Sequence, residues 1–135
     1  MELKTFRPDD KFFDDLVAKF EKEYISLDYR DILTIRRCED ITVYEAVKDS
    51  SFMGDADKFI DTFLKEVRTH VEGQNIDQVL VCIIPDNEES ILMETMCHLN
   101  DFMEIFDEET EARWGLCYSE EGTPLRLIVA VGKNS

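Results

Sequence analysis

The sequence predicts an α/β domain, a two-layer α+β sandwich in which helices pack on a four-stranded mixed sheet. Two observations predict this class. Apolar residues recur at helical spacing in four segments, and four shorter runs are apolar or rich in β-branched residues. The expected order is helix, helix, strand, helix, strand, helix, strand, strand. Packing helices on one sheet buries the apolar side of every element.

The N-terminal part is expected to contain two helices and a strand. Residues 9–24 carry an apolar stripe at helical spacing. Asp28–Arg37 is expected to form a second, shorter helix, because Ile32 and Ile35 lie three residues apart and share one side. Residues 41–47 read ITVYEAV, which favours a strand.

The middle of the chain is expected to continue with helix, strand and helix. A long helix is expected from Asp55 to Val71, and Gly73 is placed to end it. Residues 78–85, QVLVCIIP, are typical of a strand buried on both faces. A further helix is expected over Glu88–Phe106. The strand, helix and strand from residue 41 to residue 85 can form a right-handed parallel crossover.

Two strands are expected to close the domain as a hairpin. Residues 112–118 alternate in the manner of a strand, residues 120–124 (EEGTP) favour a turn, and Leu125–Val131 returns as a strand. A chain of 135 residues suits one domain, with residues 1–24 as a helical lead-in and residues 25–133 as the main part.

The charge of the chain restricts its partners. Asp and Glu number 31 against 15 Lys and Arg, which gives a net charge of −16. Such a surface repels nucleic-acid phosphates and anionic lipid headgroups. The best local basic group is Arg30, Arg36 and Arg37, and it lies among acids. We therefore expect a protein partner and exclude nucleic acid and membrane.

The N-terminus lacks the apolar core of a signal peptide, and no apolar run approaches the ~20 residues of a membrane-spanning helix. None of the cysteines forms a CxxC pair, so reduced cysteines are expected and the compartment is predicted to be the cytoplasm. The four cysteines are Cys38, Cys82, Cys97 and Cys117.

The residues that catalysis or cofactor binding would require are scattered. The five glycines form no phosphate-binding loop, and His70 and His98 fall on different expected helices. No Cys/His cluster has the spacing of metal ligands. We therefore expect no enzyme activity in this chain by itself, no cofactor and no metal.

Asp28 and Asp31 form the one constellation that suggests chemistry. They lie three residues apart at the start of the expected short helix, so both project from its first turn. Paired carboxylates can orient a water molecule for attack on a phosphate. Acids in a first turn also stabilise a helix through capping and the macrodipole. The spacing alone leaves both interpretations open.

Residues 25–35, ISLDYRDILTI, resemble the synergy loop of FtsZ, the tubulin-like cell-division GTPase, where the pattern runs I-N-x-D-F-A-D-V-x-T-V. The resemblance continues in order through the chain. It ends with Trp114-Gly115 and with PLRLIVAVG at 124–132, which is similar to the closing L-R-V-T-V-I-A-T-G of that family. It covers residues 20–133 and implies the fold of the FtsZ C-terminal domain.

In that family the synergy loop of one subunit docks on the nucleotide of the next. Asp28 and Asp31 match the two acids that act there in trans, and the resemblance makes Ser26, Asp28, Tyr29 and Asp31 the expected partner-binding residues. The nucleotide-binding domain of the family is absent from this sequence, and Ser26 replaces the usual Asn. The implied function is an assembly module that docks on or caps a tubulin-like filament, with full-length FtsZ as the partner.

Three other interpretations stay open. The chain can be a fragment of a full FtsZ. It can be a small oligomeric metabolite-binding protein or enzyme of the two-layer α/β kind, for which Arg113 and Arg126 on the expected hairpin are the candidate ligand residues. It can also be a structural domain that associates with itself through an edge strand.

Overall fold

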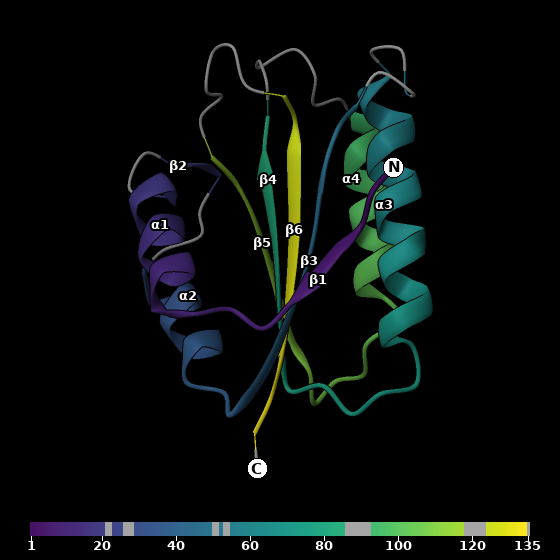
Figure 1. The fold of residues 1–135 in the computed structure, drawn as a ribbon. Helices are drawn as coiled ribbons and strands as arrows, with labels where there is room; N and C mark the ends of the chain where they lie inside the picture. The colour runs from purple at the N-terminus through teal and green to yellow at the C-terminus, as the bar shows by residue number, and fades with distance from the viewer. Residues whose placement is uncertain are drawn as a thin grey trace.

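Helices cover both faces of a central mixed sheet, as Figure 1 shows. The computed structural model describes residues 1–20, 23–25, 29–49, 52, 55–85, 93–117 and 124–134. The elements in chain order are β1 (Lys4–Phe6), α1 (Asp10–Phe20), β2 (Glu23–Ile25), α2 (Tyr29–Arg36), β3 (Asp40–Val47), α3 (Ala56–Val71), β4 (Gln78–Ile84), α4 (Met93–Met103), β5 (Glu111–Cys117) and β6 (Arg126–Lys133).

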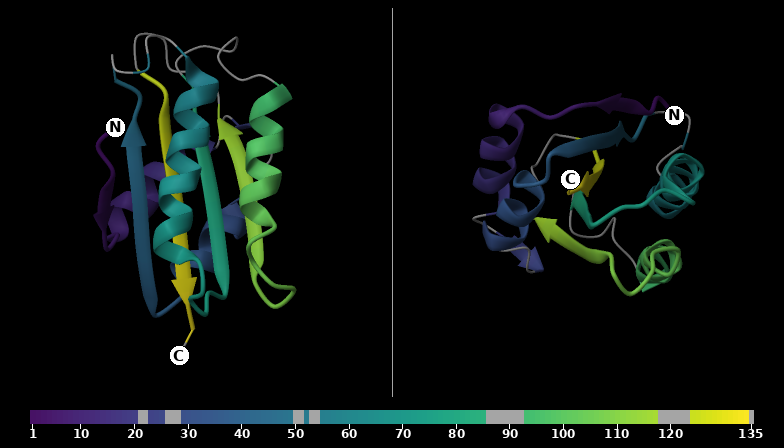
Figure 2. Two further views of the ribbon diagram at one scale, coloured as in Figure 1. Left: turned by 90° about the vertical axis from the view of Figure 1, so that its right-hand side faces the viewer. Right: turned by 90° about the horizontal axis from the view of Figure 1, so that it is seen from below.

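The six described strands form one sheet in the order β1-β3-β6-β4-β5-β2. β6 runs antiparallel to β3 on one side and to β4 on the other. β4 pairs in parallel with β5, and the short strands β1 and β2 add antiparallel edges to β3 and β5. The α3–α4 pair lies against one face of the sheet and the α1–α2 pair against the other (Figure 2).

Each face of the sheet has its own apolar core. The residues of β4 divide between them, because successive side chains of a strand point to opposite faces. Val79, Val81 and Ile83 belong to the core under α3 and α4. Leu80 and Ile84 belong to the core under α1 and α2. This double burial explains the unbroken apolar run of residues 78–84 that the sequence shows.

Helix α3 begins and ends where the sequence predicts. The Asp55 side chain accepts a hydrogen bond from the backbone N–H of Lys58 at 3.0 Å and caps the first turn. At the other end the backbone N–H of Glu72 bonds the Arg68 carbonyl, and Gly73 follows with φ of +84°. That left-handed conformation suits glycine, so the chain turns away from the helix there.

The α/β class and the mixed sheet are confirmed, and three details of the expectation are wrong. The sheet has six described strands instead of four, because the three-residue strands β1 and β2 extend its edges. Helices on both faces make three layers instead of two (Figure 1). The helical lead-in over residues 1–24 also differs, since β1 precedes α1 and β2 begins at Glu23.

The expected closing hairpin is also wrong. β5 and β6 do not pair, because β4 lies between them. A turn signal shows that the chain leaves a strand, but it does not determine which neighbour the next strand joins. β3 and β4 do run parallel to each other, as expected. They are not neighbours in the sheet, because β6 lies between them and is antiparallel to both. The expected helix over Glu88–Phe106 is observed as α4 from Met93 onward, since residues 86–92 lie outside the described part.

Gly132 on β6 lets the end of α2 approach the sheet closely. A Cβ atom built at this position would lie 2.6 Å from Sγ and 2.9 Å from Cβ of Cys38, and 3.3 Å from Ile35. Burial, together with the nearby charge of Asp77, raises the pKa of the Cys38 thiol. Cys38, Cys82 and Cys97 take part in no disulfide; the first two are buried and the third is exposed. Cys38 and Cys82 act as small apolar groups in the core under α1 and α2.

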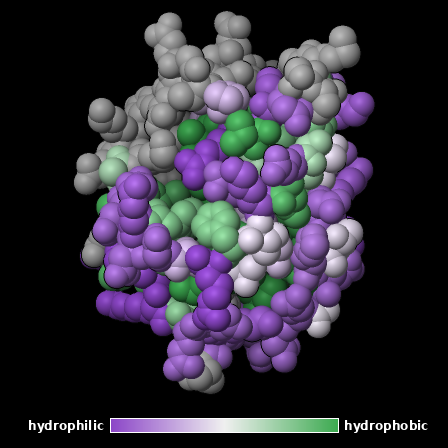
Figure 3. Space-filling view, in the orientation of Figure 1, coloured by the Kyte–Doolittle hydropathy of each residue, from purple (hydrophilic) through white to green (hydrophobic). Residues whose placement is uncertain are grey.

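The face drawn in Figure 3 shows apolar side chains at its centre, surrounded by hydrophilic ones. The N-terminal segment packs here on both cores, with Leu3 against one and Phe6 against the other. Val47, 39% exposed, is the one large apolar side chain that counts as exposed among the described residues. In the same part of the chain, no helix combines the length and the apolarity that a membrane crossing requires.

Candidate functional site

Two of the four predicted docking residues, Tyr29 and Asp31, lie at the beginning of α2. Tyr29 is the first residue of the helix and Asp31 the third, so the expected short helix is confirmed. Ser26 and Asp28 lie outside the described residues. The acid at position 31 therefore occupies the first turn, where a negative charge also stabilises the helix through its dipole.

An ion pair joins this first turn to β5. The Arg113 Nε lies 3.1 Å from Oδ1 of Asp31, whose side chain is 19% exposed. Ala112 and Trp114 pack against the α3–α4 core, so the intervening Arg113 points to the face that carries α2. The Arg113 side chain is 50% exposed and also lies 3.5 Å from Glu111. Asp31 and Arg113 thus form one charged pair at the surface of this face.

A second charged group fixes α2 to α1. The Arg36 guanidinium lies 3.0 Å from a carboxylate oxygen of Asp10 and 3.1 Å from one of Asp14, and its carbon stands 5.6 Å from the Phe13 ring centre. The hydrogen bonds to Asp10 and Asp14 raise the pKa of Arg36. Of the basic group Arg30, Arg36 and Arg37, the first two lie on α2, and Arg36 is paired with acids of α1.

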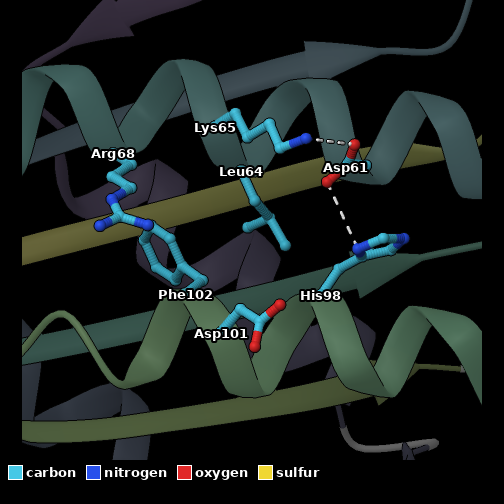
Figure 4. A pocket seen from close by; sticks show the side chains of 7 residues that line it. All are labelled: Asp61, Leu64, Lys65, Arg68, His98, Asp101 and Phe102. Carbon is cyan, nitrogen blue, oxygen red and sulfur yellow. Dashed lines mark hydrogen bonds and ion pairs between the residues drawn. The ribbon is translucent and has the colours of Figure 1, made fainter.

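Between α3 and α4, His98 contacts two carboxylates of α3, Asp57 and Asp61, of which Figure 4 shows the contact with Asp61. Its Nδ1 lies 3.3 Å from Asp61, and its Nε2 lies 3.1 Å from Oδ1 and 3.2 Å from Oδ2 of Asp57. Hydrogen-bond geometry is met only at Oδ2, and Oδ1 is buried without a hydrogen bond among the described residues. An imidazole that carries both protons can donate to both acids and so link the two helices.

A small pocket adjoins this histidine. Its cavity volume is about 100 Å³, and its wall combines acids, bases and two apolar side chains (Figure 4): Asp61, Leu64, Lys65, Arg68, His98, Asp101 and Phe102. A second pocket of about 230 Å³ lies at the C-terminal ends of α3 and α4 and includes Gly73 and Thr110. Both fall below the roughly 300–1,000 Å³ of typical small-molecule sites.

The acids and histidine between α3 and α4 do not converge on one point. Asp57 and Asp61 approach opposite nitrogens of the His98 ring, so they lie on different sides of it. Among the described residues, no three His, Cys, Asp or Glu side chains gather as ligands for one metal ion. This group is best described as a polar contact between two helices.

The two arginines considered as metabolite ligands lie apart. Arg113 is on β5 and pairs with Asp31, whereas Arg126 is on β6 and donates from Nε to Glu45 at 2.6 Å. The strand β4 separates them in the sheet. They therefore do not form one convergent site in the described structure.

Thr95 gives a stability test of the α3–α4 layer. Its side chain on α4 is fully buried, and Oγ1 has no hydrogen-bond partner among the described residues. Thr95→Val is expected to raise the free energy of unfolding by about 1 kcal/mol, because the isosteric methyl removes a buried unsatisfied hydroxyl. Urea denaturation checks this. The control is Thr62→Val on α3, which loses a bond to the Lys58 carbonyl. A loss of stability in Thr95→Val contradicts the expectation.

The comparisons with known proteins show a tubulin/FtsZ-like fold. The chain is similar to a solved structure described as "FtsZ dimer, empty (M. jannaschii)", with a TM-score of 0.61 and 15% sequence identity. The similarity covers 91% of this chain and 38% of that one, so the chain spans well under half the length of this FtsZ. No protein-family model matches the sequence, and no curated protein matches it either.

Sequence reasoning missed the two charged contacts that the fold creates. The pairing of Arg113 with Asp31 depends on β5 lying under the first turn of α2, which no local pattern indicates. The sequence places His98 only on a different expected helix from His70, whereas the structure brings it against two acids of α3. The spacing of Asp57 and Asp61, four residues apart on one side of a helix, was the available signal.

Proposed function

We propose that this protein is a non-catalytic assembly module that docks on, or caps, a tubulin-like filament of the FtsZ kind. The docking surface is residues 26–31, with Ser26, Asp28, Tyr29 and Asp31 as contact residues. The observation that carries the proposal is the agreement of two independent likenesses. The synergy-loop pattern occurs in residues 25–35, and the fold around it is similar to that of an FtsZ chain.

The position of the acids supports docking through this end of the molecule. Asp31 lies in the first turn of α2, and residue 28 directly precedes that helix in the sequence. Asp31 therefore lies at a helix start near β5, which the ion pair with Arg113 brings against it, and β5 pairs with the edge strand β2 through Leu116 and Ile25. A second subunit can approach such an end without disturbing either apolar core.

The same observations favour docking over catalysis. The five glycines of the sequence form no phosphate-binding loop, so the module is expected to hold no nucleotide of its own. Ser26 stands where the resembled loop has Asn, and Arg113 pairs with one of the two acids. We therefore expect the module to alter the assembly of a partner more than its rate of GTP hydrolysis.

Filament assembly tests the proposal directly. Light scattering of the host's full-length FtsZ with GTP is measured with and without substoichiometric protein, alongside phosphate release. The wild type is expected to lower the scattering plateau, because a subunit without a nucleotide site ends a filament. Asp28→Ala/Asp31→Ala is expected to abolish the effect.

The matched control is Glu108→Ala/Glu109→Ala, which removes the same charge from the exposed segment between α4 and β5. It is expected to behave as the wild type. If neither scattering nor phosphate release responds to micromolar excess of the wild type, the docking proposal is wrong and the partner belongs to another class.

A further inference from the structure

We propose that the outer edge of β5, over residues 111–114, is a docking site for an extended strand of a partner protein. In that strand apolar and basic side chains alternate. It joins the sheet beyond β5 through main-chain hydrogen bonds, a recurring mode of peptide recognition. The inference goes beyond the proposed filament docking and does not depend on it, because it uses backbone groups of β5 and no residue of that docking surface.

The pairing of β5 with β4 determines which backbone groups of β5 face outward. The backbone N–H of Glu111 donates to the Asp77 carbonyl, just before β4, at 3.0 Å. In a strand the N–H and C=O of one residue point to the same side, and successive residues alternate. Arg113 therefore bonds toward β4 as Glu111 does, whereas the backbone groups of Ala112 and Trp114 point to the outer side of the sheet.

The strand β2 closes only the far end of this edge. It is three residues long and pairs with Leu116 and Cys117. Among the residues that the structure describes, no strand pairs with Ala112 or Trp114 on their outer side. The N–H and C=O groups of these two residues therefore offer donors and acceptors to an added strand.

The opposite edge of the sheet is shorter and better protected. β1 has only three residues, includes Lys4, and is followed by Pro8 within two positions. Short strands, Lys and Pro are devices by which proteins prevent further strands from pairing with a sheet edge. β5 has seven residues and contains neither Lys nor Pro. Of the two edges, that of β5 is therefore the one suited to a further strand.

One face of the β5 edge is apolar. The side chains of Ala112 and Trp114 are half-buried and pack against the α3–α4 core, and Met96 and Met103 of α4 pack against the same core in the same half-buried state. Figure 2 shows α4 on this side of the sheet. Every second side chain of an added strand lies on this face, so apolar side chains suit those positions. A half-open indole is also a frequent anchor of protein interfaces.

The beginning of the same edge is acidic, which favours basic side chains at the other positions of the partner. Arg113 is the one base in residues 104–117, and it is already paired with Asp31 and Glu111. A second copy of this chain, with its net charge of −16, would bring acids against acids. A basic strand instead gains charge complementarity. The exposed acids are Asp107, Glu108, Glu109 and Glu111.

Amide hydrogen exchange of the protein alone tests whether the edge is open. The amides of Ala112 and Trp114 are expected to exchange at least roughly 10-fold faster than those of Arg113 and Gly115, which bond to β4. Equal protection of all four amides overturns the proposal, because the edge is then already covered. Protection of Ala112 and Trp114 that rises with protein concentration assigns the edge to a second copy and overturns the proposal as well.

Peptide binding tests the occupant. The probe is the capped peptide Lys-Val-Lys-Val-Lys-Val-Lys, and the readout is the fluorescence of Trp114, the one tryptophan of the chain. Saturable binding is expected, with slower exchange of the Ala112 and Trp114 amides. The same peptide N-methylated at every residue is expected to bind at least roughly 10-fold more weakly, since it cannot donate main-chain hydrogen bonds. No binding at millimolar peptide, or equal binding of both peptides, overturns strand pairing.

Charge variants test the requirement for a basic partner. Glu108→Gln/Glu109→Gln is expected to weaken peptide binding roughly 3- to 10-fold at low salt, and the difference is expected to disappear at high salt. The matched control is Glu39→Gln/Asp40→Asn, which removes the same charge at the start of β3. It is expected to bind as the wild type, because β6 and β4 separate β3 from β5. Equal losses in the two variants overturn the local charge complementarity in favour of bulk charge.

Discussion

Replacing Phe63 by alanine is expected to lower the free energy of unfolding by about 3–5 kcal/mol, the usual cost of deleting a fully buried aromatic ring. Phe63 lies in the middle of α3, is fully buried, and belongs to the core that this helix shares with the sheet. The ring has no polar group, so the loss measures packing and cavity formation alone. Urea denaturation followed by circular dichroism measures it.

The control for this change is Phe106→Ala. Phe106 is only half buried, beyond the end of α4, and packs edge-on against Phe102 at 5.5 Å between ring centres. Water already reaches the Phe106 side chain, so Phe106→Ala is expected to lower the free energy of unfolding clearly less than Phe63→Ala does. If Phe63→Ala costs less than Phe106→Ala, then α3 does not pack on the sheet as described.

Gly132→Ala is expected to destabilise the protein by about 1–3 kcal/mol, the range of overpacked cores. The added methyl would lie 2.6 Å from Sγ and 2.9 Å from Cβ of Cys38, which no rotamer change relieves fully. The end of α2 must therefore move off the sheet. The cost is expected to fall in Gly132→Ala/Cys38→Ala, because the closest atom is then removed. Denaturation of the two single variants and the double variant measures this coupling.

Gly73→Ala is the matched control, since it adds the same methyl group but is expected to destabilise the protein by a different mechanism. No heavy atom lies within 4 Å of its Cβ position, but φ is +84°. Its expected cost of about 1–2 kcal/mol is backbone strain. Cys38→Ala must leave that cost unchanged. Equal rescue of both glycine variants by Cys38→Ala would contradict the steric explanation for Gly132.

The sequence predicted the structure best where the residues of a single segment determine the type and burial of that helix or strand. The apolar stripe of α3 and the two-sided burial of β4 are each encoded within a single segment, and both were predicted within a few residues. The three-residue strands β1 and β2 are too short to carry a period and were missed. The choice of β6's neighbours depends on pairing between distant segments, which local turn chemistry does not determine.

In the candidate site, too, the local features were predicted and the contact between distant segments was not. Asp31 was predicted at the start of a short helix, because an acid in a first turn is a local signal. Its partner Arg113 was assigned to a hairpin that does not exist, because the ion pair arises only when β5 lies under α2. The assembly role itself stays a proposal, since a likeness at 15% identity establishes the fold alone.

The central position of β6 has a consequence for how the chain is made. During synthesis, β3 and β4 leave the ribosome before the strand that separates them in the finished sheet. Until residues 126–133 emerge, both strands present unpaired backbone edges, and neither apolar core can close. The nascent chain is therefore expected to be prone to aggregation until β6 emerges, and to close this sheet only after β6 has joined β3 to β4.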